Sequence, residues 1–256
     1  MPPVVAERAV DRIVAARFFT GPGVLVEVGA ARPDYLSVSA HFRMLAWRVI
    51  AIEPIPEFCE LQRQAGNEVL QYACSEVDQD DVDFVVVDSH KSAYADGTVS
   101  FESFSSLSIK PGYSALTSGQ GTHTIKVKTR RLDTILKEHA PDIRAIDVLS
   151  IDVEGWELEV LRGLDLDRYR PKVMVIENFL SDRSYRQYAR SNDYTLWRRL
   201  PPNEVYVATE LLRGWERVAA NSRETLLELP PSRWFRSVGR NVRKRLKALR
   251  AARSAA

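Results

Sequence analysis

The sequence has few cysteines and no long apolar run. Only two cysteines, Cys59 and Cys74, occur among its 256 residues, so a disulfide framework is excluded and a reduced, cytoplasmic location is expected. No apolar run approaches the roughly 20 residues that span a bilayer. Charged side chains interrupt residues 1–20, so we expect no secretory signal there.

Several catalytic and metal-binding patterns are also missing. The chain has no Cys-x-x-Cys or His-x-x-x-His spacing of the kind that binds zinc. It has neither a Gly-Lys-Ser/Thr phosphate loop nor a Gly-x-Ser-x-Gly nucleophile elbow. These absences disfavour a zinc enzyme, a P-loop nucleotide hydrolase and a serine hydrolase, and the sequence predicts no metal site.

Charge is distributed unevenly along the chain. The net charge is +2, but residues 229–256 hold nine Lys/Arg and no Asp/Glu, so residues 1–228 carry a net −7. We therefore expect one domain over residues 1–228 and a basic tail over 229–256. Apolar residues recur every four positions within 233–254, so this tail could form a helix on the anionic inner membrane surface, bind nucleic acid nonspecifically, or remain solvated.

Apolar strand-like runs alternate with helical patterns, which favours an α/β fold with a mostly parallel sheet. Strands are expected at residues 24–28, 49–52, 69–73, 84–87, 125–128, 146–153, 172–176, 194–198 and 204–208, the last two as a closing hairpin. Helices are expected at 33–45, 56–65, 156–162 and 181–191. Between the strands at 84–87 and 125–128, residues 89–124 form an insertion that is either a lid or a hairpin without catalytic role.

A strand ending in Gly29 and followed by a helix forms the first candidate binding loop. A dinucleotide site would favour Gly-x-Gly-x-x-Gly, but Ala31 and Pro33 occupy the later part of this loop. S-adenosylmethionine carries no phosphate, so this loop can accommodate it. Glu53 ends the second strand, 24 positions beyond Gly29, where a carboxylate can accept both ribose hydroxyls.

Further polar residues end the third strand and two later ones. Cys74 and Ser75 follow the third strand, where a polar group could reach an adenine edge. Asp152 and Glu154 follow the strongest apolar strand, and two carboxylates there are costly unless they bind something. They could align an acceptor, act as a base, or bind a divalent cation. Glu177 ends the adjacent strand and could join them.

The four histidines are not clustered in the sequence. His123, at the end of the insertion, is the outside candidate for a catalytic base. The candidate catalytic residues are therefore Asp152, Glu154, Glu177 and His123. The candidate donor-binding residues are Glu27, Val28, Gly29, Ala30, Glu53, Pro54, Cys74, Ser75 and Asp152.

Five segments together resemble FkbM-type methyltransferases of the class I, S-adenosylmethionine-dependent superfamily. They are residues 26–30, 50–54, 127–136, 146–157 and 171–178, and the resemblance covers about 20–210. It implies a Rossmann-like seven-stranded sheet, with helices on both faces and an antiparallel last strand. It also implies that residues 27–30 line the donor, Glu53 binds its ribose, and Asp152 and Glu154 flank donor and acceptor. Two departures are Glu27, where Asp is usual, and Pro33, where Gly is usual.

The resemblance implies O-methylation of a hydroxyl in a sugar, glycolipid or secondary metabolite. Two other interpretations remain open: a non-catalytic methyltransferase-fold binding module, and an NAD(P)-dependent oxidoreductase, which Ala31 and Pro33 disfavour. Nucleic acid is an unlikely acceptor because Asp-Val-Glu-Gly stands at residues 152–155 instead of an Asn-Pro-Pro-Tyr type loop.

Overall fold

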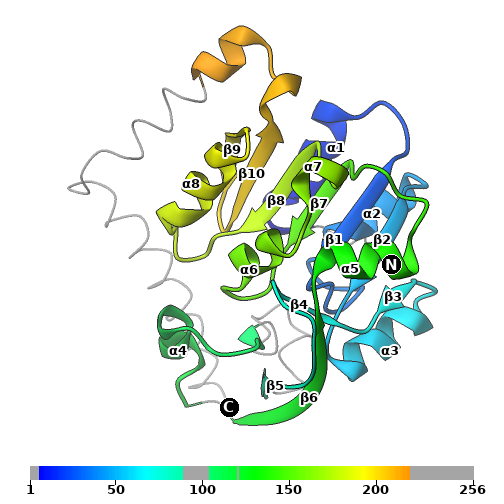
Figure 1. Ribbon diagram of the computed structural model, residues 1–256, viewed down its shortest axis with the longest axis vertical. Helices are drawn as coiled ribbons and strands as arrows, with labels where there is room; N and C mark the ends of the chain where they lie inside the picture. Colours follow the sequence, from blue (N-terminus) through cyan, green and yellow to red (C-terminus); the bar gives the residue numbers. More distant parts are fainter. Residues whose placement is uncertain (1–5, 89–103, 120, 220–256) are drawn as a thin grey trace, which may run out of the picture.

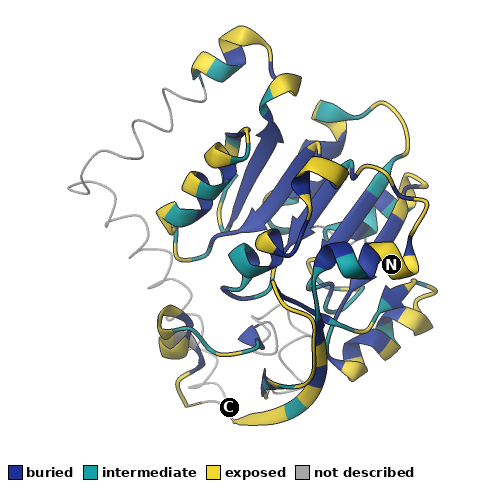
Figure 2. Ribbon diagram, in the orientation of Figure 1, coloured by how far each residue is buried: buried dark blue, intermediate teal, exposed yellow. Residues whose placement is uncertain are grey.

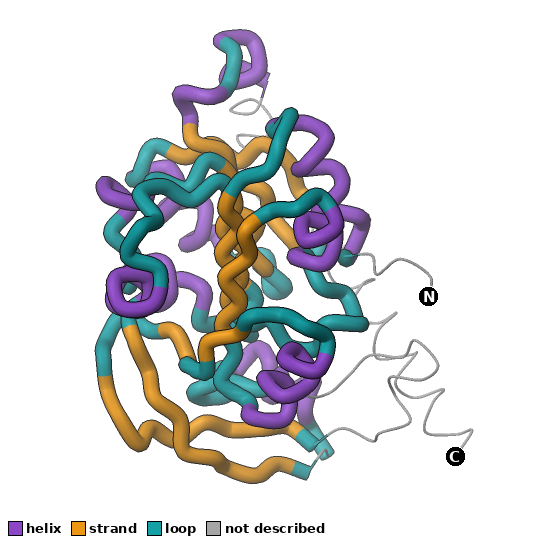
Figure 3. The backbone as a smooth tube through the Cα atoms, turned by 90° about the vertical axis from the view of Figure 1, so that its right-hand side faces the viewer, coloured by secondary structure: helices purple, strands orange, loops and turns teal. Residues whose placement is uncertain are grey.

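A seven-stranded sheet with helices on both faces forms the centre of the molecule (Figures 1 and 3). The computed structural model describes residues 6–88, 104–119 and 121–219. The strands, in spatial order, are β3 (Val69–Leu70), β2 (Arg48–Ile52), β1 (Val24–Val28), β7 (Val148–Ile151), β8 (Val173–Glu177), β10 (Asn203–Ala208) and β9 (Tyr194–Leu200). Within the described residues, no helix combines the length and apolar character needed to cross a membrane.

Neighbouring strands from β3 to β8 are parallel, and β10 pairs in antiparallel fashion with both β8 and β9. The expected mostly parallel sheet with an antiparallel last strand is therefore confirmed. Because β1, β2, β7 and β8 run in the same direction, their carboxyl ends meet at one edge. In open α/β sheets this edge is where ligands bind.

Alternating side chains of the strands build two separate cores. Val26, Ile50 and Leu149 face one side of the sheet, and Leu25 and Val49 face the other. The first side is covered by α5 (Leu132–His139), α6 (Glu157–Arg162), α7 (Leu166–Tyr169) and α8 (Arg183–Ser191); the second by α1 (Val10–Phe18) and α2 (Ser39–Met44). Figure 2 shows the central strands buried beneath helices whose outer faces are exposed. Burial on both faces explains why these strands are almost continuously apolar.

Two predicted elements differ from the structure. The helix expected at 33–45 begins only at Ser39, because Leu36 has φ of 49° and the buried carboxylate of Glu27 accepts the Ser39 N–H at 3.0 Å. This cap comes from a distant strand and has no local sequence signature. The strand expected at 69–73 is two strands, β3 and β4 (Ala73–Cys74), which belong to different sheets. Of the other predicted helices, 56–65 corresponds to α3 (Pro56–Gln64).

The second sheet has three strands in the order β4, β6 (Thr122–Arg130) and β5 (Gln79–Val87). In Figure 3 it curves beneath the main sheet. The strands expected at 84–87 and 125–128 are thus parts of two longer strands that pair in antiparallel fashion. Short helix α4 (Pro111–Thr117) belongs to the insertion between them. Residues 89–103 of that insertion and the predicted basic tail at 229–256 lie outside the described residues.

Candidate active site

Two adjoining cavities lie at the carboxyl ends of β1, β2 and β7. Both are lined by Val28, Gly29, Ala31, Asp152 and Glu154. The first contains about 550 Å³ of space and the second about 1190 Å³, their openings to solvent included. The residues that the two cavities share, among them Gly29 and Asp152, mark where the cavities meet.

Gly29 brings the ends of β1 and β7 together. Its φ is 81°, and a Cβ atom built on it would overlap the backbone carbonyl oxygen of Asp152. The Asp152 N–H in turn donates to the Val28 carbonyl at 3.0 Å, and the Gly29 N–H donates to the Ile52 carbonyl at 3.0 Å. Gly29 is therefore required by close approach of backbone to backbone, in addition to any approach to a ligand.

Glu53 fixes the loop that follows Gly29. Its Oε2 accepts the N–H of Ala31 at 2.8 Å, and its Oε1 accepts the N–H of Ile55 at 2.9 Å. Ala31 has φ of 43°, a left-handed conformation that usually favours glycine. The side chain of Glu53 lines the first cavity although it is almost completely buried. Burial raises the pKa of Glu53 to about 7, despite the two backbone hydrogen bonds.

Apolar side chains form most of the first cavity beyond Glu53. Its other lining residues are Pro54, Ile55, Phe58, Tyr72, Ala73, Cys74, Phe84, Ser105, Ser106, Leu107, Val153 and Trp156. Pro54 and Cys74, which the sequence predicts to bind the donor, are among these lining residues. Ser75 is not among the lining residues of either cavity. Its carbonyl instead packs tightly against Gly163, where a Cβ atom would overlap it.

The second cavity is more polar. Its lining beyond the shared residues comprises Glu7, Glu27, Ala30, Arg32, Tyr35, Leu36, Ser37, Val38, Phe104, Ser150 and Glu177. Glu27 and Ser150 are paired across β1 and β7, so both point to the same face of the sheet. The Glu27 carboxylate also accepts the Ser39 hydroxyl at 2.5 Å. Burial raises the pKa of Glu27, whereas its bonds to Ser39 lower it.

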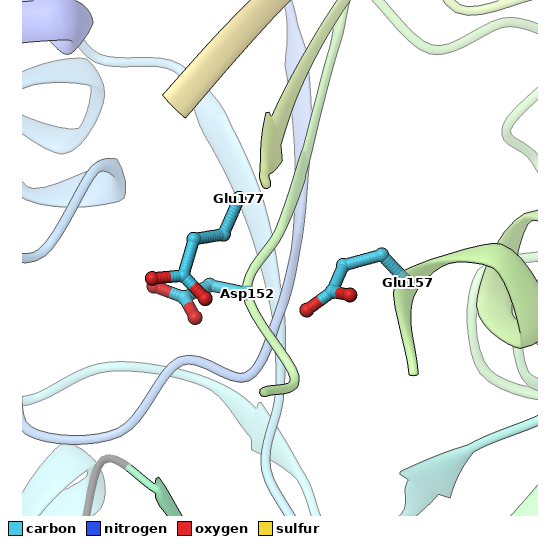
Figure 4. A group of neighbouring side chains, drawn as sticks. All are labelled: Asp152, Glu157 and Glu177. Atoms are coloured by element: carbon cyan, nitrogen blue, oxygen red, sulfur yellow. The ribbon is translucent and has the colours of Figure 1, made fainter. Parts of the chain in front are cut away.

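An acidic group lies where the cavities meet (Figure 4). Asp152 is exposed, Glu154 and Glu177 are buried, and carboxylate oxygens of Asp152, Glu157 and Glu177 lie within 4.8 Å of one another. Burial, followed by the negative charges of Asp152, Glu154 and Glu157, raises the pKa of Glu177 well above its ordinary value. Glu154 has φ of 56°, so this turn combines an unusual backbone conformation with a buried carboxyl group.

Glu157 is a member of this group that sequence reasoning missed. Its Oε1 accepts the N–H groups of Val153 at 3.1 Å and Gly155 at 3.0 Å, and its Oε2 accepts the Tyr185 hydroxyl at 2.5 Å. Burial raises its pKa. An acidic residue in the first turn of a helix ordinarily interacts with the helix dipole. Only the short distance in sequence between Glu157 and Asp152 could have suggested a role for Glu157 at this site.

The insertion contributes walls to both cavities. Phe104 lines the second cavity, and residues 105–107 line the first. Tyr113 of α4 packs close to Gly155, with rings of Phe104 and Phe179 around it at centroid distances of 6.4 and 6.1 Å. Trp156 Nε1 donates to the Ser108 carbonyl at 3.0 Å. The described part of the insertion is thus attached to the turn that carries the acidic group.

The structure does not bring His123 to this site. His123 lies on β6, is exposed, and places its Nδ1 2.7 Å from Oδ1 of Asp88. It is absent from the linings of both cavities. The reason is the long β5–β6 hairpin, which carries residue 123 into the second sheet, whereas the sequence suggested only a short strand beginning after it.

Comparisons with known proteins found a matching domain family and similar chains. The methyltransferase FkbM domain matches residues 27–198. "Methyltransferase 1" of Beauveria bassiana (strain ARSEF 2860) is 46% identical over 46 residues, which are 18% of each chain. "Methyltransferase sdnD" of Sordaria araneosa is 40% identical over 55 residues, covering 19% of this chain and 21% of that protein.

A crystal structure of methyltransferase FkbM from Methylobacillus flagellatus KT is 14% identical, with a TM-score of 0.43. The match covers 73% of this chain and 43% of that one. The chain thus matches about a fifth of the length of the two fungal relatives and less than half of the solved chain. Because the matched domain extends over most of its length, the chain belongs to the FkbM methyltransferase family.

Proposed function

We propose that the protein is an S-adenosylmethionine-dependent O-methyltransferase that acts on a hydroxyl of a sugar, glycolipid or secondary metabolite. The observation that carries this proposal is that Gly29 and Asp152 line both adjoining cavities and Glu53 lines the first of them. These residues come from three different strands and meet at the sheet edge where α/β folds bind ligands.

The first cavity suits the adenosine part of the donor. Glu53 offers carboxylate oxygens to ribose hydroxyls, and the neighbouring Ile55, Phe58 and Phe84 offer apolar surface to an adenine ring. The sulfonium group would lie at the junction of the cavities, where Asp152 and Glu154 supply negative charge. All of the residues that we assign to donor binding therefore line one or both of the cavities.

The second cavity suits a hydroxylated acceptor. Its polar lining, including Ser37, Ser150 and Tyr35, provides hydrogen-bond partners for an acceptor with several hydroxyls. Methyl transfer requires the acceptor oxygen to be aligned with the methyl–sulfur bond, and such alignment contributes several kcal/mol. The hydroxyl proton must also be removed, and the carboxylates available for this are Asp152 and Glu154, which line both cavities, and Glu177, which lines the second.

Calorimetric titration with S-adenosylhomocysteine tests the donor site. We expect saturable binding to the wild-type protein and a loss of about tenfold or more in affinity for Glu53→Ala. Glu60→Ala, an exposed glutamate on the neighbouring α3, serves as the control and should bind like the wild type. Absence of binding at high micromolar ligand, or saturable binding of NADH instead, would contradict the proposal.

A further inference from the structure

Three carboxylates from separate elements converge beside the second cavity. Asp152 follows β7, Glu157 begins α6, and Glu177 ends β8. One oxygen of each lies within 4.8 Å of the others. Figure 4 shows the carboxylates of Asp152 and Glu177 close together, with that of Glu157 directed toward them from the opposite side. Three carboxylates at this separation repel one another unless positive charge lies among them.

Burial makes this repulsion costly. Glu157 is 0% exposed and Glu177 is 5% exposed, so water screens their charges poorly. Glu157 accepts three hydrogen bonds, two from backbone N–H groups and one from Tyr185. These contacts hold the Glu157 carboxylate in place beside those of Asp152 and Glu177. The cluster is thus positioned by the fold around it.

A second observation is independent of the clustering. Oε2 of Glu177 is buried and accepts no hydrogen bond from any residue that the structure describes. Leaving a buried acceptor without a partner costs about 1–3 kcal/mol, and more for a charged group. The side chain is directed into the cluster (Figure 4), where a ligand bearing positive charge would satisfy it.

The cluster is also accessible. Asp152 and Glu177 line the second cavity, and Asp152 is exposed, so an ion can enter from that side with some of its water.

An all-carboxylate ligand set favours a hard cation over zinc or copper. Mg²⁺ is typically held by one or two carboxylates and retains several waters. We propose that Asp152, Glu157 and Glu177 bind one divalent cation of the Mg²⁺ or Mn²⁺ type. This site rests on the carboxylates alone and does not depend on the transfer reaction proposed above.

Binding of Mn²⁺ tests the inference directly. The full-length protein is treated with chelator, desalted and titrated with MnCl₂ while electron paramagnetic resonance follows the free ion. We expect one Mn²⁺ per chain, displaced by excess Mg²⁺, and binding weakened about tenfold or more in Glu177→Gln. Glu60→Gln removes an exposed charge outside the cluster and should leave Mn²⁺ affinity unchanged.

Circular dichroism establishes that each variant is folded. If Glu177→Gln does not fold, Asp152→Asn is the second test, because Asp152 is exposed and its loss should leave the fold intact. No stoichiometric Mn²⁺ binding to wild-type protein at millimolar metal would overturn the inference and indicate that a shared proton relieves the repulsion. Binding that both folded variants retain unchanged would also overturn it.

Titration with S-adenosylhomocysteine in the presence of chelator separates the two proposals. Donor binding without Mn²⁺ binding rejects the cation site and leaves the donor site intact. Mn²⁺ binding without donor binding does the reverse.

Discussion

The α-carbon of Gly29 packs against the backbone carbonyl of Asp152 so closely that no side chain fits between them. This contact joins the loop after β1 to the turn after β7, and both loops line the two cavities. The geometry of the candidate site is therefore set by a backbone contact as well as by its carboxylates.

Replacement of Gly29 by alanine should disrupt both the fold and the site. We expect Gly29→Ala to lower the free energy of unfolding by roughly 3 kcal/mol or more, since it adds overlap with Asp152 to the strain of a positive φ. Gly66→Ala is the matched control: its φ is 78°, but nothing lies within 4 Å of the added Cβ. It should cost only about 1–2 kcal/mol. Urea unfolding of both variants measures the difference, and equal losses would contradict the structural interpretation.

Donor binding should strengthen as pH rises through neutrality. Burial, with a smaller contribution from the charge of Glu27, raises the pKa of Glu53 to about 7. Ribose hydroxyls donate to the ionised form, so binding at pH 6 must first remove a proton, whereas at pH 8 the carboxylate is already ionised. One pKa unit corresponds to about 1.4 kcal/mol, so S-adenosylhomocysteine should bind about tenfold more weakly at pH 6 than at pH 8.

Glu53→Gln is the control for this pH dependence, because its amide does not titrate. Its affinity for S-adenosylhomocysteine should be lower than that of the wild type and nearly constant between pH 6 and 8. A variant that retains the full wild-type pH profile would show that another group controls donor binding.

Arg186 should be essential for stability but not for chemistry. It is 3% exposed, and its Nη1 donates to Oε1 of Glu204 at 2.9 Å. Glu204 also pairs with Nε of Arg199 at 2.9 Å, so Arg186→Ala removes one buried charge-assisted hydrogen bond and leaves Glu204 with another cation. We expect the substitution to lower the free energy of unfolding by about 1.5–3 kcal/mol. Arg183→Ala changes an exposed arginine on the same helix and should stay within about 0.5 kcal/mol of the wild type. Denaturant melts that coincide would refute this role for Arg186.

Both thiols should be unreactive in the native protein. Burial raises the pKa of Cys59 to about 12 and raises that of Cys74 further, and Sγ of Cys59 donates to the Glu53 carbonyl at 3.1 Å. Because the thiolate is the reactive form, Ellman's reagent at pH 8 should modify neither cysteine until the protein unfolds. Rapid modification of one thiol in folded protein would place that cysteine in an accessible, polar environment instead.

Sequence reasoning predicted the parts of the fold that depend on local pattern. Apolar runs predicted every strand of the main sheet. They did not predict that β3 and β4 are separate strands, because this depends on the strand with which each segment pairs. The cap of α2 by Glu27 and the register of the β5–β6 hairpin also depend on residues distant in sequence. Tertiary contacts of this kind leave no periodic signal.

The candidate site was predictable where residues follow strands directly. Glu53, Asp152 and Glu177 lie at strand ends, and parallel strands bring such ends to one edge. Glu157, Phe104 and Tyr113 were missed because a first-turn helix acid and aromatic residues within an insertion have many ordinary structural roles. His123 was misplaced because its position depends on the length of β6.

The decisive measurement is a crystal structure of the protein soaked with S-adenosylhomocysteine. The account predicts adenine in the apolar cavity beside Phe58, ribose hydroxyls within hydrogen-bond distance of Glu53, and sulfur near Asp152. Ligand bound elsewhere, or ribose oriented away from Glu53, would contradict the account.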